Sequence, residues 1–250
     1  MAAAAGGLEA GIATLEERKR ALEQAHREPS TSTMEHAKLN KSVARNPTTL
    51  AAAAMAGDTD AIAEHLAARV DVNGEADFGG SALLHAAAKG QLAAVEALLA
   101  AGALACKTSK GGRNPLHAAA ERDYADVVTA VLGASDASEA LNARDKDGRT
   151  PLMLAAQGDA AAACEALLGG GADLEVADEG DHKDTALLIA ARLGSLRAAE
   201  VLARAGANFF ESEDQTTSLA FDAARQGVHP SEERREAMYD MLLDVMLDRE

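Results

Sequence analysis

The sequence predicts an all-α fold in which short helix-turn-helix units stack side by side into a solenoid. Three observations support this prediction. A pattern of capping residues and alanine pairs recurs every 33 to 36 residues, which is the signature of a repeat architecture. Of the 250 residues, 48% are apolar and only 2% are aromatic. The apolar residues are mostly Ala, Leu and Val, a composition that favours helices over sheets.

Each unit begins with a residue that is well suited to cap a helix. The six starts are Thr48, Ser81, Asn114, Thr150, Thr185 and Ser218. A side-chain oxygen of each accepts a hydrogen bond from a backbone N–H of the first turn, so we expect six helix starts. Pro115 and Pro151 follow two of these caps, at the first helical position, where a missing N–H costs nothing.

Further features recur in the same register. Five and six residues after each cap stands an alanine pair, which predicts close helix packing: Ala53-Ala54, Ala86-Ala87, Ala119-Ala120, Ala155-Ala156, Ala190-Ala191 and Ala223-Ala224. Nine residues after the cap stand residues that tolerate a left-handed conformation: Gly57, Gly90, Asp123, Asp159, Gly194 and Gly227. A second helix, a further Gly such as Gly102 and a polar turn complete the unit.

Two stretches match a known repeat closely. They are Asn114-Pro115-Leu116-His117-Ala118-Ala119 and Asp145-Lys146-Asp147-Gly148-Arg149-Thr150-Pro151-Leu152. They resemble the Thr-Pro-Leu-His-x-Ala signature and the hairpin of the ankyrin repeat family. Gly171-Ala172-Asp173-Leu174 and Gly206-Ala207-Asn208 resemble its Gly-Ala-Asp-Val element. The resemblance covers residues 48–229 and implies an ankyrin-repeat solenoid of about six units.

The units are not identical. The third carries three extra residues, which we place within 133–141, and the fourth carries two extra near 179–182. The first unit has Arg69 in place of the second Gly. These departures affect local loops, and we expect the fold to be unchanged, because terminal units of a solenoid are normally atypical.

Segments without the repeat flank it. The sequence therefore divides into an N-terminal helical segment at 1–46, the repeat domain at 47–229 and a C-terminal capping helix at 230–250. In the first segment Leu8, Ile12, Leu15 and Leu22 share one stripe of an expected helix. That helix either caps the first repeat or pairs with a partner helix. In the last segment an apolar face is expected to cover the end of the stack: Met238, Leu242, Val245 and Met246.

Charge and cysteine content exclude several classes of function. The formal charge of −16 argues against general affinity for nucleic acid or an anionic membrane. Cys106 and Cys164 have no spacing typical of a disulfide framework or a zinc site, so no metal or cofactor is expected. Reduced thiols and the lack of a signal peptide fit a cytoplasmic protein, which is also compatible with the nucleus. We expect a monomer.

The family resemblance implies that a partner protein binds a concave surface made of hairpin tips and the exposed side of each first helix. Nine basic residues map to this surface: Lys89, Lys110, Arg113, Arg122, Lys146, Arg149, Lys183, Arg192 and Arg225. Four acidic residues map there: Asp77, Glu121, Asp147 and Asp184. The excess of positive charge predicts an acidic partner segment, although charged tips are often simply solvated. Phe78 either anchors the partner or packs under the first hairpin.

No catalytic site is predicted. The chain lacks nucleotide-binding, metalloprotease and serine-hydrolase motifs, and its seven His are scattered. His117 occupies the signature position where, in the resembling family, it bonds neighbouring turns. Two alternatives remain to a partner-binding function: self-association through the N-terminal amphipathic helix, and a role as substrate. Asn73 occupies the position that asparaginyl hydroxylases modify in similar repeats, or it simply stabilises its turn.

Overall fold

The computed structural model describes residues 47–77, 79–180, 183–209, 219–227 and 231–248, and these residues form helices joined by hairpins and turns. The only pairing of strand type within them is an isolated bridge between Glu75 and Ser81. The all-α prediction is therefore confirmed. The predicted helix that carries Leu8 and Leu22 lies outside the described residues.

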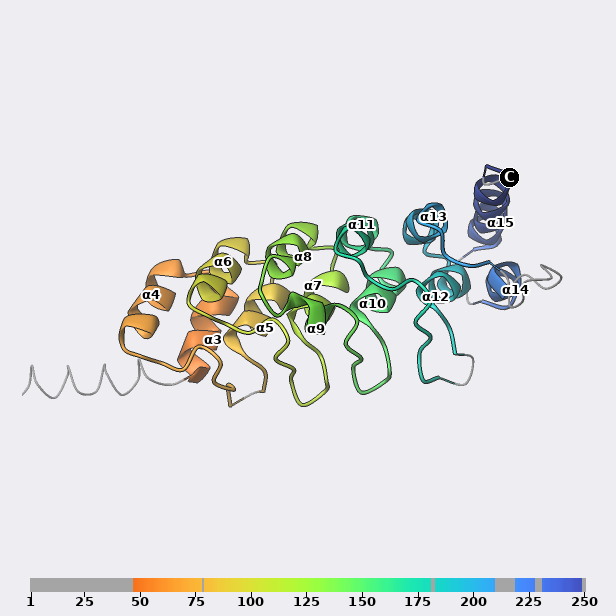
Figure 1. The fold of residues 1–250 in the computed structure, drawn as a ribbon. Helices are drawn as coiled ribbons and strands as arrows, with labels where there is room; N and C mark the ends of the chain where they lie inside the picture. Colours follow the sequence, from red (N-terminus) through yellow and green to blue (C-terminus); the bar gives the residue numbers. More distant parts are fainter. Residues whose placement is uncertain (1–46, 78, 181–182, 210–218, 228–230, 249–250) are drawn as a thin grey trace, which may run out of the picture. The chain divides into compact units, whose positions relative to one another are not determined.

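The helices form two rows (Figure 1). The first-helix row contains α3 (Pro47–Ala56), α5 (Ala82–Ala88), α7 (Pro115–Ala120), α10 (Pro151–Gln157), α12 (Ala186–Leu193) and α14 (Leu219–Gln226). The second-helix row contains α4 (Thr59–Ala67), α6 (Leu92–Ala100), α8 (Ala125–Leu132), α11 (Ala161–Gly169) and α13 (Leu196–Arg204). Each helix contacts the corresponding helix of the next unit, which is how a solenoid buries its core.

The predicted caps are confirmed for three units. Ser81, Asn114 and Thr150 accept hydrogen bonds from the backbone N–H groups of Leu84, His117 and Met153 at 3.3, 3.1 and 3.4 Å. Ser218 lies outside the described residues.

One predicted cap is wrong, and one is confirmed in position but lacks the predicted side-chain bond. Helix α3 begins at Pro47, so Thr48 lies inside the helix, because proline is favourable at a first helical position. Thr185 has the extended backbone of a cap, but its hydroxyl accepts no capping bond. The extended backbone alone starts α12 there, since water also satisfies N–H groups of a first turn.

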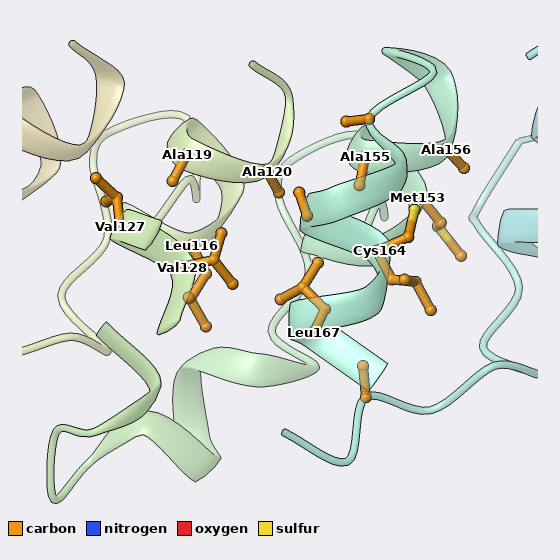
Figure 2. Close-up of a cluster of buried hydrophobic side chains, with 14 of the residues drawn as sticks. Leu116, Ala119, Ala120, Val127, Val128, Met153, Ala155, Ala156, Cys164 and Leu167 are labelled. Atoms are coloured by element: carbon orange, nitrogen blue, oxygen red, sulfur yellow. The ribbon is translucent and has the colours of Figure 1, made fainter. Parts of the chain in front are cut away.

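The alanine pairs form the core between neighbouring first helices. All twelve of these alanines are at most 9% exposed. Figure 2 shows the core of two adjacent units, in which Ala119, Ala120, Ala155 and Ala156 accompany larger side chains such as Leu116 and Leu167. Small side chains let the short helices approach closely, and larger apolar residues fill the space between the two rows.

Five of the six residues predicted to be left-handed have that conformation. Gly57, Gly90, Asp123, Asp159 and Gly194 have φ values of 73°, 68°, 60°, 53° and 74°. The prediction for Gly227 is wrong, because its φ lies outside the left-handed region. Glycine is required there for a different reason: a Cβ atom would collide with the backbone of Arg192.

The extra residues of the third unit form a short helix. The sequence placed them within 133–141, and the structure folds Ala137–Leu141 into α9. Ala140 and Leu141 are buried. Asp136, which precedes α9, accepts a hydrogen bond from the backbone N–H of Cys106 at 2.8 Å. The insertion is thus packed against the turn of the preceding unit.

The C-terminal helix covers the end of the stack. Helix α15 (Glu232–Leu247) starts at Ser231, whose hydroxyl accepts a bond from the N–H of Arg234 at 3.2 Å. Met238, Leu242 and Val245 are buried, and α15 contacts α13 and α14. Three residues of the predicted capping face are thus buried, and the fourth, Met246, is half-buried.

Candidate partner-binding surface

The hairpins of successive units are each closed by a backbone hydrogen bond. In each, a backbone N–H bonds to a carbonyl across the hairpin: Ala76 to Gly80 at 3.0 Å, Ser109 to Arg113 at 2.8 Å, Asp145 to Arg149 at 2.8 Å and Asp178 to Asp184 at 3.0 Å. Adjacent hairpins are joined by a bond of 3.0 Å from the N–H of Lys146 to the carbonyl of Gly111. We call the hairpin tips and the exposed side of the first helices the hairpin face.

Asp145 organises this face from inside. Its side chain is almost fully buried and accepts bonds from the N–H groups of Asp147 and Arg149 at 2.9 and 3.0 Å. The guanidinium groups of Arg113 and Arg149 lie 3.6 and 3.5 Å from its carboxylate. Burial alone would raise the pKa of Asp145, but these hydrogen bonds and the charge of Arg149 outweigh burial and lower it.

Three of the predicted partner-binding arginines are held in ion pairs within the hairpin face. Arg113 bonds to Glu121 at 2.9 Å. Arg149 bonds to Asp147 at 2.6 Å and to Gln157 at 3.1 Å. Arg192 makes two bonds of 2.8 and 2.9 Å to Asp184. A bidentate pair of this kind orders both side chains, so these arginines first of all fix the hairpins to their helices.

The pairing follows a rule that the sequence analysis missed. The residue directly before each cap pairs with the residue seven positions after that cap. The pairs are Arg113 with Glu121, Arg149 with Gln157, and Asp184 with Arg192. The fifth unit has the two charges exchanged, which keeps the attraction. This exchange is visible when the units are aligned with one another, and it was the signal that could have identified the pairs. Asp145 could not be found in this way, because its burial comes from two units at once.

The other predicted basic residues remain available. Lys89, Arg122, Lys146, Lys183 and Arg225 are exposed, and none forms an ion pair with another described residue. The side chain of Lys110 is 82% exposed and lies 3.9 Å from Glu75, a surface pair of little energetic weight. Phe78 lies outside the described residues, so its two alternatives stay open.

Four of these cations occur in two consecutive units and the hairpin that follows them. Lys89 and Arg122 lie just after the first helices α5 and α7, which contact each other. Lys110 and Lys146 lie in adjacent hairpins. We call Lys89, Lys110, Arg122 and Lys146 the basic quartet. Lys183 is different, since it has a φ of 50° at the turn position that Gly112 and Gly148 occupy in the two preceding hairpins.

The second-helix row has the opposite charge. Its exposed acidic residues are Asp60, Glu64, Glu96, Asp126, Glu165 and Glu200. The exposed arginines of this row, Arg197 and Arg204, are both paired, with Asp159 and Glu200 respectively. The described part of the chain therefore separates its available positive charge from much of its negative charge.

His117 is a structural residue. It is fully buried, and its Nε2 lies 3.0 Å from the carbonyl of Arg149 in the next hairpin. Its Nδ1 lies 3.3 Å from the backbone nitrogen and 2.8 Å from the side-chain oxygen of Asn114, so both ring nitrogens are engaged. Burial lowers the pKa of His117, which keeps the imidazole neutral. The side chain joins two units and has no free nitrogen for catalysis.

Asn73 joins its turn to the next one. Its amide nitrogen donates to the carbonyl of Gly102 at 3.0 Å, and its amide oxygen accepts from the N–H of Leu104 at 2.8 Å. Asn142 makes the second of these bonds in a later unit, to the N–H of Asp173 at 3.0 Å. The turn-stabilising role of Asn73 is therefore present in the structure.

The two cysteines have raised pKa values, which makes both poor nucleophiles. The side-chain hydrogen bond to Asp136 and burial raise the pKa of Cys106 to about 11. Burial raises the pKa of Cys164 to about 12. Among the described residues, no group of three His, Cys, Asp or Glu side chains is placed to hold a metal ion.

Stacked helix pairs with projecting hairpins define the protein as an all-helical repeat solenoid. Residues 50–139 and 136–213 match the family model described as Ankyrin repeats (3 copies), so the chain belongs to the ankyrin repeat family. Members of this family are generally protein–protein interaction modules and are typically not enzymes. No curated protein matches the chain. None of the described helices is both long and apolar enough to cross a membrane.

Proposed function

We propose that this chain binds an acidic segment of another protein through the basic quartet on the hairpin face. The observation that carries the proposal is the division of the basic residues into two groups. Arg113, Arg149 and Arg192 are neutralised by local partners, whereas the basic quartet extends into solvent. Lys89, Arg122 and Lys146 form no ion pair with another described residue, and Lys110 has only the exposed Glu75 at 3.9 Å. These cations therefore have most to gain from a carboxylate of a partner protein.

The position of the quartet supports an extended partner. Hydrogen bonds between neighbouring hairpins hold Lys110 and Lys146 on a defined framework, because the N–H of Lys146 bonds to the carbonyl of Gly111. The buried Asp145 fixes the base of the same two hairpins. A framework that is ordered before binding loses little entropy on binding, so the lysine side chains meet a partner at low cost.

The negative charge of the rest of the chain restricts which acidic partners can bind the basic quartet. A basic patch on a chain of net charge −16 attracts a local acidic segment but repels a partner that is acidic throughout. Electrostatic attraction of this kind accelerates encounter and weakens at raised salt. We therefore expect a partner whose acidic residues lie in one short segment.

The test uses a labelled acidic peptide and fluorescence anisotropy. The peptide alternates Glu with Ala around a central Leu. In the binding variant, Lys89, Lys110, Arg122 and Lys146 are each replaced by Gln. A matched control lowers the net charge by the same amount, but on the second-helix side of the stack. Its changes are Ala93→Glu, Thr129→Glu, Ala162→Glu and Ala205→Glu, all at exposed positions.

The proposal predicts that the binding variant loses about tenfold or more in affinity, whereas the control loses far less. The affinity of the wild type should fall as salt is raised, and that of the binding variant should respond less. Equal losses in both variants would show that only net charge matters, and an unchanged affinity in the binding variant would remove the quartet from the interface.

A further inference from the structure

A groove of about 550 Å³ opens on the opposite side of the stack from the basic quartet, between the second and third units. Helices α6 and α8 and the segments that follow them line it, and no residue of a first helix or of a hairpin tip takes part. Its volume lies within the range of about 300 to 1,000 Å³ that is typical of ligand pockets. The groove is therefore separate from the hairpin face.

The insertion in the third unit contributes to one wall of the groove. After α8 the chain continues through Ser135 and Asp136 into α9, so the usual Gly-Ala-Asp turn is absent from this unit. On the facing wall, a Cβ atom at Gly102 would meet nothing within 4 Å. Ser135 and Asp136, which lead into the extra helix α9, thus form part of the groove wall.

The floor of the groove is apolar. Leu104 is 43% exposed, although large apolar side chains are usually buried in this chain. Leu99 is half-buried beside it, and Ala130 and Ala134 form the opposite wall. An exposed leucine within a concave apolar site is a candidate contact for a partner side chain, whereas an isolated exposed leucine needs no explanation.

The rim of the groove is acidic. Glu96 and Asp136 contribute carboxylates, and no Lys or Arg lines the groove. Burial by itself would raise the pKa of Asp136, but hydrogen bonds from the backbone N–H and thiol of Cys106 outweigh it and lower the pKa, so this carboxylate stays charged. The C-terminal ends of α6 and α8 also point their partial negative charges here.

We propose that this groove binds a protein segment that presents an aliphatic side chain next to Lys or Arg. The aliphatic side chain contacts Leu99 and Leu104, and the basic groups pair with Glu96 and Asp136. Charge decides between classes of ligand, because a nucleic acid or an acidic peptide would be repelled by the same two carboxylates. The segment is thus the opposite in charge of the one expected at the hairpin face, and the two sites are compatible with simultaneous binding.

The test probes the full-length chain with a short labelled peptide in which a central pair of leucines is flanked by lysines. One variant, Leu104→Glu, places a charge in the apolar floor at an exposed position. Another variant, Glu96→Lys, reverses the rim. Each has a matched control: Leu243→Glu changes an equally exposed leucine of α15, and Glu165→Lys changes the equivalent exposed position of α11.

The groove predicts about tenfold or greater loss of binding in Leu104→Glu and a smaller loss in Glu96→Lys, with both controls close to wild type. Peptides with serine in place of leucine, or glutamate in place of lysine, should bind weakly. Hydrogen exchange should show protection at residues 99–104 and 130–136. Melting curves that match wild type confirm that the variants fold.

Three results would overturn the proposal. The first is that the peptide binds the Leu104→Glu variant as tightly as wild type. The second is that Leu243→Glu reduces the affinity as much as Leu104→Glu does. The third is that protection from hydrogen exchange appears in the hairpins and not in the groove. A concentration-dependent dimer that disappears in Leu104→Glu would also overturn it, because the occupant would then be a second copy of this chain. None of these results depends on the basic quartet, so the two proposals fail independently.

Discussion

The two rows of helices are stabilised in different ways. Three first helices, α5, α7 and α10, begin at a residue of their own unit whose side chain caps them. The second helices α6, α8, α11 and α13 have no capping bond from the residue that precedes them. For two of these the bond comes from the previous unit, since Asp123 accepts from the N–H of Ala163 at 2.8 Å and Asp159 from the N–H of Ala198 at 3.0 Å.

This difference shows where the coupling between units lies. The first helices α5, α7 and α10 are capped within their own unit, as is the second helix α4 by Asp58, whereas α11 and α13 depend on a carboxylate of the unit before them. The same two aspartates have the left-handed backbone conformation in the turn between the helices of their own unit. Each therefore shapes a turn in its own unit and caps a helix in the next. These hydrogen bonds between units involve the second helices and the base of the hairpins. The side chains at the hairpin tips are therefore not needed to join the units and can be charged.

The largest expected effect comes from a charge in the first-helix row. Ala190 is fully buried between neighbouring first helices. Ala190→Asp should lower the free energy of unfolding by about 4 kcal/mol or more, because the carboxylate has no partner there. Urea unfolding followed by circular dichroism measures the loss. The control, Ala162→Asp, adds the same charge at an exposed position of α11 and should change stability little; similar losses in both would contradict the difference between buried and exposed faces.

A smaller loss is expected at the link between hairpins. His117→Ala leaves the backbone N–H of Asn114 and the carbonyl of Arg149 without their side-chain partner and opens a cavity. We expect a decrease of about 2 to 4 kcal/mol in the free energy of unfolding. Arg122→Ala, at an exposed position nearby, serves as the control. A variant at 117 as stable as this control would mean that the link is not needed.

The same histidine predicts a dependence on pH. Its pKa in the folded chain lies below the ordinary value of 6.5, so below pH 6.5 the unfolded chain binds a proton that the folded chain does not. Stability therefore falls as pH drops from 6.5 towards the folded pKa. Unfolding measured over a pH series should show this slope in wild type and lose part of it in His117→Ala. Identical slopes would assign the pH dependence to other groups.

The smallest loss is expected in the second-helix row. Asp123→Gly keeps the left-handed conformation but removes the capping carboxylate of α11, which should lower stability by about 1 kcal/mol. Amide hydrogen exchange should become faster in the first turn of α11. The first turn of α13, which Asp159 caps, is an internal control and should keep its protection. Uniform acceleration in both helices would argue against local capping by the previous unit.

The sequence predicted the repeat well because its strongest signals are local. Caps, alanine pairs and left-handed positions depend on neighbours within one unit, so spacing alone revealed them. The roles of Asp123 and Asp159 depend on an amide about forty residues further along, and no local pattern encodes that contact. The insertion was located correctly, but its helical fold depends on Ala140 and Leu141 being buried against the stack.

The candidate site was predicted less completely than the fold. The partner-binding role of the nine basic residues stays a prediction. Whether each of them is available depends on ion pairs that the sequence does not show. Arg113 illustrates this, since Glu121 was counted on the face and the buried Asp145 was not. Exposure and pairing are three-dimensional properties, and they reduce the candidate site to the basic quartet with Lys183 and Arg225.

Protection from hydrogen exchange would show whether the hairpin face binds an acidic segment, as proposed. Hydrogen–deuterium exchange of the full chain would be compared with and without the acidic peptide. We expect the peptide to slow exchange in residues 107–113 and 143–149 and at the ends of α5 and α7. Exchange in α6, α8 and α11 should not change. Protection confined to the second-helix row, or no protection in a sample shown to bind the peptide, would contradict it.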